Sequence, residues 1–196
     1  MGAELIAWSF ASGWASGVNA YAVVLLMGLF ERFGHVAEIP DVLARTDVLV
    51  VSGILFTLEM VADKFPYVDS AWDSVHTVIR PLVGATIGYL IGHETSDLTA
   101  AFFAATGGFS ALASHLVKSG VRAGVNTSPE PVSNIAVSTA EDVTVAGVIA
   151  LAVASPWLAA TVAALLLFAG LALAIFLVRR VRRLTRRTPH PRPEAL

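Results

Sequence analysis

The last long apolar run constrains the fold of this chain more than any other feature. It reads WLAATVAALLLFAGLALAIFLV over residues 157–178, and arginines follow it at once. An α-helix needs about twenty consecutive apolar residues to cross the hydrocarbon core of a bilayer. A helix that is apolar on every side has no face that suits water. The run therefore predicts a membrane-spanning helix that faces lipid.

Five further apolar runs precede it. The chain is 56% hydrophobic and 14% charged, whereas about 25% of the residues in soluble domains are charged. We therefore predict an all-α fold, a polytopic membrane helix bundle of about six transmembrane helices in one domain over residues 1–178. The five runs cover about residues 4–30, 47–63, 72–92, 98–121 and 137–155.

The first run begins without the basic residues of a secretory signal peptide and continues past signal length, so we expect it to be retained as a helix. Its segment ASGWASGVNAYA and the segment AATGGFSALASH in the fourth run are rich in Gly, Ala and Ser. Such segments favour close helix packing in lipid or a locally broken helix. The small residues also offer contacts for a homo-oligomer.

The C-terminal tail, residues 179–196, carries seven arginines against Glu194, a net charge of +6. Because the chain as a whole has a net charge of −2, residues 1–178 carry −8. Basic residues next to a transmembrane helix stay in the cytoplasm, so we expect a cytoplasmic C-terminus. The tail lacks the interleaved aromatic residues of a nucleic-acid site, and its proline-rich end is expected to be disordered.

Two pairs of short segments indicate an internal repeat. GVNAYA (17–22) is similar to GFSALA (108–113), and VSGIL (51–55) is similar to VAGVI (145–149). Two halves, residues 4–93 and 98–178, would each contain three passes, and an odd number of passes inverts the second half relative to the first. Compositional bias toward Ala, Gly and Val is the alternative explanation.

Charged and polar residues recur at helical spacing within or beside the apolar runs. Asp69, Asp73, His76 and Arg80 follow at intervals of four, three and four, and so share one helix face. Similar spacing occurs in three other runs. The candidate pathway or substrate-binding residues are Glu59, Asp63, Lys64, Asp69, Asp73, His76, Arg80, His115, Lys118, Arg122, Asn134, Glu141 and Asp142.

These charges are costly in lipid. A charge at the centre of a transmembrane helix costs about 2.5 to 3.5 kcal/mol, whereas one apolar residue contributes only about 0.3 to 0.6 kcal/mol in favour of insertion. The side chains must therefore form buried ion pairs, line a hydrated cavity or, near the ends of the runs, lie at the headgroups. A hydrated cavity predicts a small transporter or channel for an ion or small polar solute. Buried pairs predict a lipid-binding or assembly protein without transport.

The sequence leaves open whether the solute is a cation or an anion. The negative charge of residues 1–178 favours cations, because acidic walls concentrate them, whereas Arg80, Lys118 and Arg122 suit an anion. Histidines beside carboxylates can relay protons and couple transport to pH.

Three polar stretches resemble a known family. VADKFPYVDSAWDSVHTVIRP (61–81), SGWASGVNAYAVVLLMGLFERFG (12–34) and SPEPVSNIAVSTAEDV (128–143) are similar to the bacterial multi-pass membrane family called domain of unknown function 4126. The resemblance covers most of the chain up to about Leu151. It implies a membrane protein of the bacterial inner membrane and assigns no activity to any residue.

The motifs of common enzymes are incomplete, so we expect no enzyme. In GHETSD (92–97), Asp97 occupies the place of the second histidine of a zinc protease motif. The chain has no cysteine and no phosphate-binding loop, so we expect neither metal nor cofactor.

Overall fold

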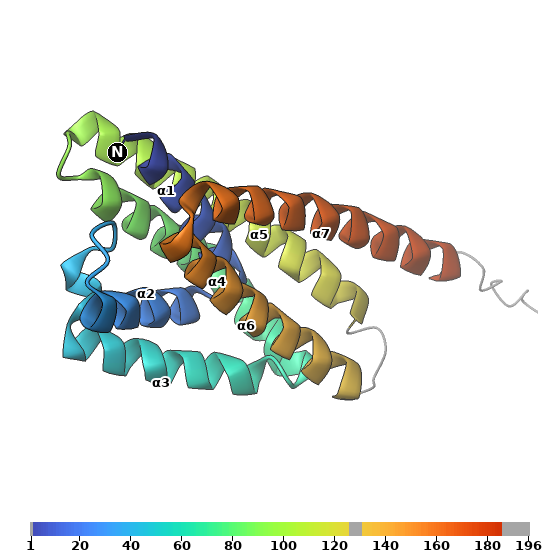
Figure 1. Cartoon of the computed structure of the whole chain (residues 1–196). Helices are drawn as coiled ribbons and strands as arrows, with labels where there is room; N and C mark the ends of the chain where they lie inside the picture. The colour runs from blue at the N-terminus through green and yellow to red at the C-terminus, as the bar shows by residue number, and fades with distance from the viewer. Residues whose placement is uncertain (1, 126–130, 186–196) are drawn as a thin grey trace, which may run out of the picture.

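The computed structural model describes residues 2–125 and 131–185, and within these ranges it contains helices and no strands (Figure 1). The all-α prediction is confirmed for this part of the chain. Four described segments are long and apolar enough to cross a membrane, at residues 71–92, 97–125, 134–154 and 156–180. These helices have the length and apolarity typical of a membrane protein, whereas the predicted number of six transmembrane helices is not confirmed. The elements are α1 (Gly2–Val18), α2 (Ala20–Gly34), the 3-10 helix η1 (Asp41–Ala44), α3 (Thr46–Ala62), α4 (Pro66–Gly92), α5 (Asp97–Val125), α6 (Pro131–Ala154) and α7 (Pro156–Thr185).

The first apolar run, predicted as one helix, is divided into α1 and α2 at Asn19. Asn19 has extended backbone angles, φ −148° and ψ 98°. Its side-chain oxygen accepts a hydrogen bond of 2.9 Å from the backbone N–H of Ala22 and so caps the N-terminus of α2. A broken helix is therefore correct for this segment. The second segment rich in Gly, Ala and Ser lies inside the continuous helix α5.

Small residues bring α1, α4 and α5 into backbone contact. A Cβ atom on Gly107 of α5 would collide with the backbone carbonyl of Gly84 in α4. A Cβ atom on Gly13 of α1 would collide with the backbone of Gly107. Close packing of this kind is the usual role of glycine between helices in membranes.

Helices α1 and α5 run in the same direction. Ser9 of α1 donates a hydrogen bond to the carbonyl of Phe103, and the Lys118 ammonium donates one to the carbonyl of Val18. The partner numbers rise together along the two helices, so the helices are parallel. An inverted repeat would make the first helices of the two halves antiparallel, so the predicted repeat is not confirmed.

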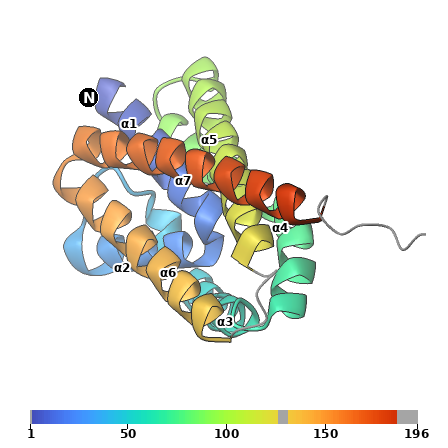
Figure 2. The same cartoon turned by 90° about the vertical axis from the view of Figure 1, so that its right-hand side faces the viewer.

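One end of the bundle is marked by the basic end of α7. Gly120 and Gly124 of α5 face Ala174 and Leu177 of α7, so these two helices are also parallel and end on the same side. We call this side the arginine end, because α7 continues there through Arg179 and beyond the rest of the bundle (Figures 1 and 2).

The opposite end, which we call the pocket end, gathers the start of α1, the loop after α2 and the end of α4. Glu4, Glu38 and Glu94 from these segments line one pocket. Helices α1 and α2 therefore form a hairpin that enters and leaves at the pocket end, with its turn at Asn19 inside the bundle. The start of α1 and the end of α7 lie at opposite ends of the molecule (Figure 1).

Candidate functional site

Charged side chains from α3, α4, α5 and α6 meet inside the half of the bundle next to the arginine end. Four are carboxylates and three are cations, all joined by ion pairs of 2.6 to 3.9 Å. The side chains of all members except Glu141 are at most 10% exposed, and that of Glu141 is 16% exposed. We call this group the charged cluster, and it consists of Glu59, Asp63, Asp73, Arg80, Lys118, Arg122 and Glu141.

Arg80 lies near the middle of α4 and is fully buried. Its guanidinium donates to Glu59 Oε1 at 2.6 Å and to Asp73 Oδ1 at 3.0 Å. Asp73 lies two helical turns before Arg80, so their spacing places both on one face of α4. Glu59 comes from α3, and the pair therefore ties α3 to α4.

The Lys118 ammonium occupies the centre of the cluster. It donates to Asp63 Oδ2 at 3.0 Å and lies 3.4 Å from Glu141 Oε2 and 3.9 Å from Glu59 Oε1. The ammonium also donates a hydrogen bond to the backbone carbonyl of Val18, the last residue of α1. A cation at a helix C-terminus is favourable because the carbonyls there have no partner inside the helix.

Arg122 closes the cluster toward the arginine end. It donates two hydrogen bonds to the Glu141 carboxylate, at 3.1 and 2.6 Å, which is the paired geometry that suits a guanidinium. It also donates to the side chain and the backbone carbonyl of Asp63. Arg122 therefore joins α5 to both α3 and α6.

The break at Asn19 lies against this cluster. The Asn19 amide donates to Asp142 Oδ1 at 3.0 Å, so an acidic side chain of α6 lies beside the N-terminus of α2. The C-terminus of α1 meets the Lys118 cation on the other side of the break. Each helix end thus faces a charge of the sign that its dipole favours.

The cluster bridges helices that are not closely packed together. Within the described residues, α3 and α5 have few close backbone approaches, and the same holds for α5 and α6. Long charged side chains cross these gaps, as Arg122 does to Glu141. The site is a space between helices that side chains fill, in contrast to the backbone contact of α1, α4 and α5.

The two predicted histidines occupy different positions. His115 Nδ1 accepts from the Arg80 guanidinium at 2.8 Å, which leaves the ring proton on Nε2, 3.0 Å from the Thr77 hydroxyl. His115 is therefore part of the hydrogen-bonded surroundings of the cluster. His76 instead bonds to the Trp72 carbonyl and the Tyr21 hydroxyl, and it stacks on the Trp72 ring.

Several buried polar atoms in this region have no hydrogen-bond partner in the part of the chain that the structure describes. They include one carboxylate oxygen each of Glu59 and Asp63, both side-chain amide atoms of Asn134 and the hydroxyl of Ser138. Unpartnered buried polar atoms are costly, about 1 to 3 kcal/mol each, unless water or an ion satisfies them.

The remaining sequence candidates divide as follows. Lys64 follows the end of α3 and is partly buried, and its ammonium donates to the Met60 carbonyl of α3 rather than to the cluster. Asp142 adjoins the cluster through Asn19, and Asn134 is fully buried on the same helix. The side chain of Asp69 lies outside the described residues, as does the end of the tail, 186–196.

Sequence reasoning missed several polar partners of the site. Ser119 donates to Asp73 Oδ2 at 3.2 Å, and Tyr21 bonds to His76. Asn19, the cap at the helix break, was part of a segment noted only for its small residues. One feature of the sequence could have indicated the break: Asn19, a residue type that favours helix N-caps, follows Gly17-Val18 and precedes an apolar run.

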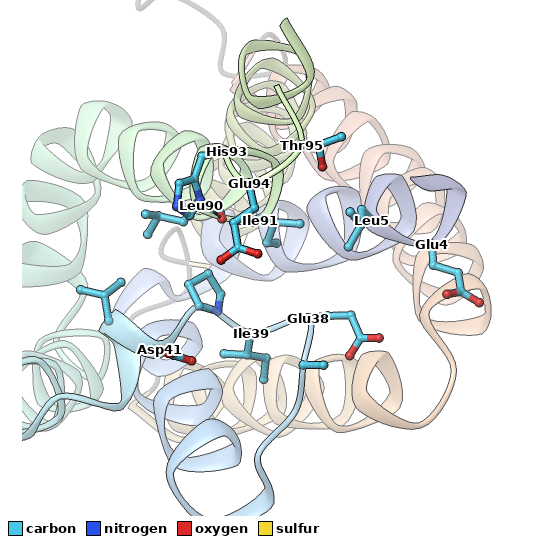
Figure 3. Close-up of a pocket in the computed structure, with 13 residues that line it drawn as sticks. Glu4, Leu5, Glu38, Ile39, Asp41, Leu90, Ile91, His93, Glu94 and Thr95 are labelled. Carbon is cyan, nitrogen blue, oxygen red and sulfur yellow. Dashed lines mark hydrogen bonds between the residues drawn. The ribbon is translucent and has the colours of Figure 1, made fainter. Parts of the chain in front are cut away.

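The pocket end carries a separate acidic site. The pocket has a volume of about 510 Å³ and lies between the start of α1, the loop 37–42 and residues 90–95. Figure 3 shows Glu38, Asp41 and Glu94 around it, with Glu4 at its edge. No member of the charged cluster lines this pocket.

A family model described as "Domain of unknown function (DUF4126)" matches residues 6–179. The chain belongs to this family. The match extends from α1 into the basic end of α7, and so includes the helix break and the whole charged cluster of this DUF4126 protein. The comparisons with curated proteins and with solved structures give no match.

Proposed function

We propose that this DUF4126 protein is a small membrane transporter that binds a monovalent cation at the charged cluster. One observation carries the proposal. The cluster and the adjoining Asp142 bring five buried or half-buried carboxylates together with three cations, an excess of two negative charges among the described residues. Uncompensated charge is too costly at membrane depth, so a bound cation or protons must balance it.

The broken helix supports a transport role. Discontinuous helices in transporters place their ends at substrate and ion sites near the middle of the membrane. Here Asn19 interrupts the α1–α2 hairpin beside Lys118 and Asp142. Movement of the hairpin relative to α5 and α6 would change the partners of both charges, which is a route from ion binding to conformational change.

The charge distribution supports an orientation. Because basic flanks stay inside, the arginine end faces the cytoplasm and the pocket end faces outward. If α3 crosses together with the four candidate spans in α4 to α7, the arrangement is five crossings plus a hairpin that enters from outside, in place of six crossings. The acidic pocket of Glu4, Glu38, Asp41 and Glu94 would concentrate cations at the outer surface.

Packing favours a carrier over a channel. The backbone contact of Gly13, Gly84 and Gly107 holds α1, α4 and α5 together at positions between the charged cluster and the acidic pocket. A continuous pore would need these helices to separate. A carrier exposes its site to one side of the membrane at a time, which is compatible with tight helix packing between the charged cluster and the pocket end.

A second function has an observation of its own in its favour. Every cation of the cluster has at least two polar partners, as expected for a structural network that holds the helices of a non-transporting assembly protein. Such a network would keep its stability without an ion and would move none.

Flux into proteoliposomes separates the two. Purified protein is reconstituted, and uptake of radiolabelled sodium, radiolabelled rubidium, protons and radiolabelled chloride is measured against empty liposomes. We expect one cation to enter faster than in empty liposomes, with chloride unchanged. Uptake of chloride alone would overturn the cation assignment, and uptake of none of them would favour the structural network.

A further inference from the structure

The inner face of α6 carries polar groups that the charged cluster does not use. Asn134 and Ser138 lie one turn apart, and Glu141 and Asp142 follow on the same face within the next turn. Asn134 is 0% exposed and Ser138 is 1% exposed. Neither side chain has a hydrogen-bond partner among the described residues.

Two threonines on other faces of the same helix show that this is unusual. Thr139 and Thr144 donate their hydroxyls to the carbonyls four residues earlier, at 2.8 and 2.6 Å, as Ser and Thr commonly do in membrane helices. Ser138 makes no such bond. Its hydroxyl and the amide of Asn134 therefore remain available to a polar ligand within the bundle.

From these positions we propose that Asn134 and Ser138 line a water-filled path. The path runs along α6 from the arginine end to Glu141 and supplies water and small cations to the charged cluster. Polar atoms at successive turns are what a chain of bound water molecules needs, since each water requires two to four polar partners. The buried, unpartnered oxygens of Glu59 and Asp63 provide further acceptors where the path reaches the cluster.

The path ends at the cluster. Beyond Asp142, the same face of α6 continues with Val145, Ile149 and Ala152, each 0% exposed. These residues belong to the apolar core around α1. Water thus enters from one side only, and the parallel ends of α5 and α7 place that side at the arginine end, which is the cytoplasmic side in the proposed orientation.

The chain contains no cysteine, so single cysteines can be introduced without background. Ser138→Cys and Asn134→Cys are tested with a charged, membrane-impermeant thiol reagent in intact cells and in inside-out vesicles. Val145→Cys is the control for a dry buried position. Thr139→Cys, whose residue is exposed on the outer surface of the bundle, is the control for a lipid-facing position.

We expect the cysteines at 138 and 134 to react about ten times faster than both controls, because a thiol ionises readily only in contact with water. Reaction is expected from the cytoplasmic side only. Equal rates at 138 and 145, equal rates at 138 and 139, or reaction from outside would each overturn the path. Ser138→Cys changes one atom, and co-elution with wild type checks its fold.

This inference rests on the proposed function for the identity of the ion that uses the path and for the orientation that makes the arginine end cytoplasmic. The labelling needs no transport, so the two proposals fail separately. A protein that labels as expected but moves no cation would have a hydrated crevice without the proposed function. A protein that transports but does not label would take its cation by another route.

Discussion

Arg80 offers the sharpest test of the charged cluster, through the substitution Arg80→Met. The guanidinium is fully buried and donates to Glu59 at 2.6 Å and to Asp73 at 3.0 Å. Methionine fills much of the same volume but removes the charge, so two buried carboxylates lose their nearest cation. Removing one partner of a buried ion pair costs about 3 to 5 kcal/mol.

The loss is measured as a shift in thermal unfolding of the purified protein in detergent. For a chain of this size, about 1 kcal/mol corresponds to a shift of about 2 to 4 °C, so Tm should fall by about 6 to 20 °C. The matched control is Arg45→Met, because Arg45 pairs with Asp47 at 2.7 Å but both side chains are 63% exposed. Exposed pairs contribute little, so this variant should unfold like wild type.

A compensating variant tests the reason for the effect. Neutralising both carboxylates together with the cation, in Glu59→Gln/Asp73→Asn/Arg80→Met, should recover most of the lost stability, since the two carboxylates that lost their nearest cation are then neutral. If Arg80→Met unfolds at the same temperature as Arg45→Met, the Arg80 guanidinium does not stabilise the two buried carboxylates. If the triple variant is less stable than Arg80→Met, unpaired charge is not the cause.

Substitutions at Gly107, Asn19 and His115 test the packing, the helix break and the histidine. Gly107→Ala should disrupt the contact between α4 and α5 and lower Tm, whereas Gly147→Ala, where a Cβ atom meets open space, should leave Tm unchanged or raise stability by up to about 1 kcal/mol. Asn19→Ala should cost about 0.5 to 2 kcal/mol through loss of the cap, and Asn19→Asp should be less stable at neutral than at acidic pH because it places a second carboxylate beside Asp142. His115→Leu removes a buried acceptor and should cost about 1 to 3 kcal/mol in the same assay, so an unchanged Tm would contradict its contact with the guanidinium.

The sequence allowed the helices and the faces of the cluster to be predicted. Five of the six apolar runs correspond to single helices, α3 to α7, because the length and apolarity of each run determine where a helix can form in lipid. The spacing of Asp73 and Arg80 placed them on one face, and a hydrogen bond of 3.0 Å joins them. Helical periodicity is a local property, and so it can be read from one sequence.

The partners between helices could not be predicted in this way. Whether Lys118 meets Asp63 or Asp73 depends on the register and tilt of α5 against α3 and α4, which local patterns do not contain. The turn at Asn19 was one of two interpretations, because small residues serve both a break and close packing. The outer pocket was missed because Glu4, Glu38 and Glu94 lie in separate segments that only the folded chain brings together.

The most direct measurement of the central claim is cation flux through Glu59→Gln in proteoliposomes. Glu59 is fully buried and has one carboxylate oxygen without a partner. Glutamine keeps its size and removes its charge. Asp97→Asn, at an exposed carboxylate that belongs neither to the charged cluster nor to the acidic pocket, is the matched control. We predict that Glu59→Gln elutes and unfolds as a folded protein yet moves no more cation than empty liposomes, while Asp97→Asn retains flux. Wild-type flux through folded Glu59→Gln would contradict the assignment of the charged cluster as the cation site.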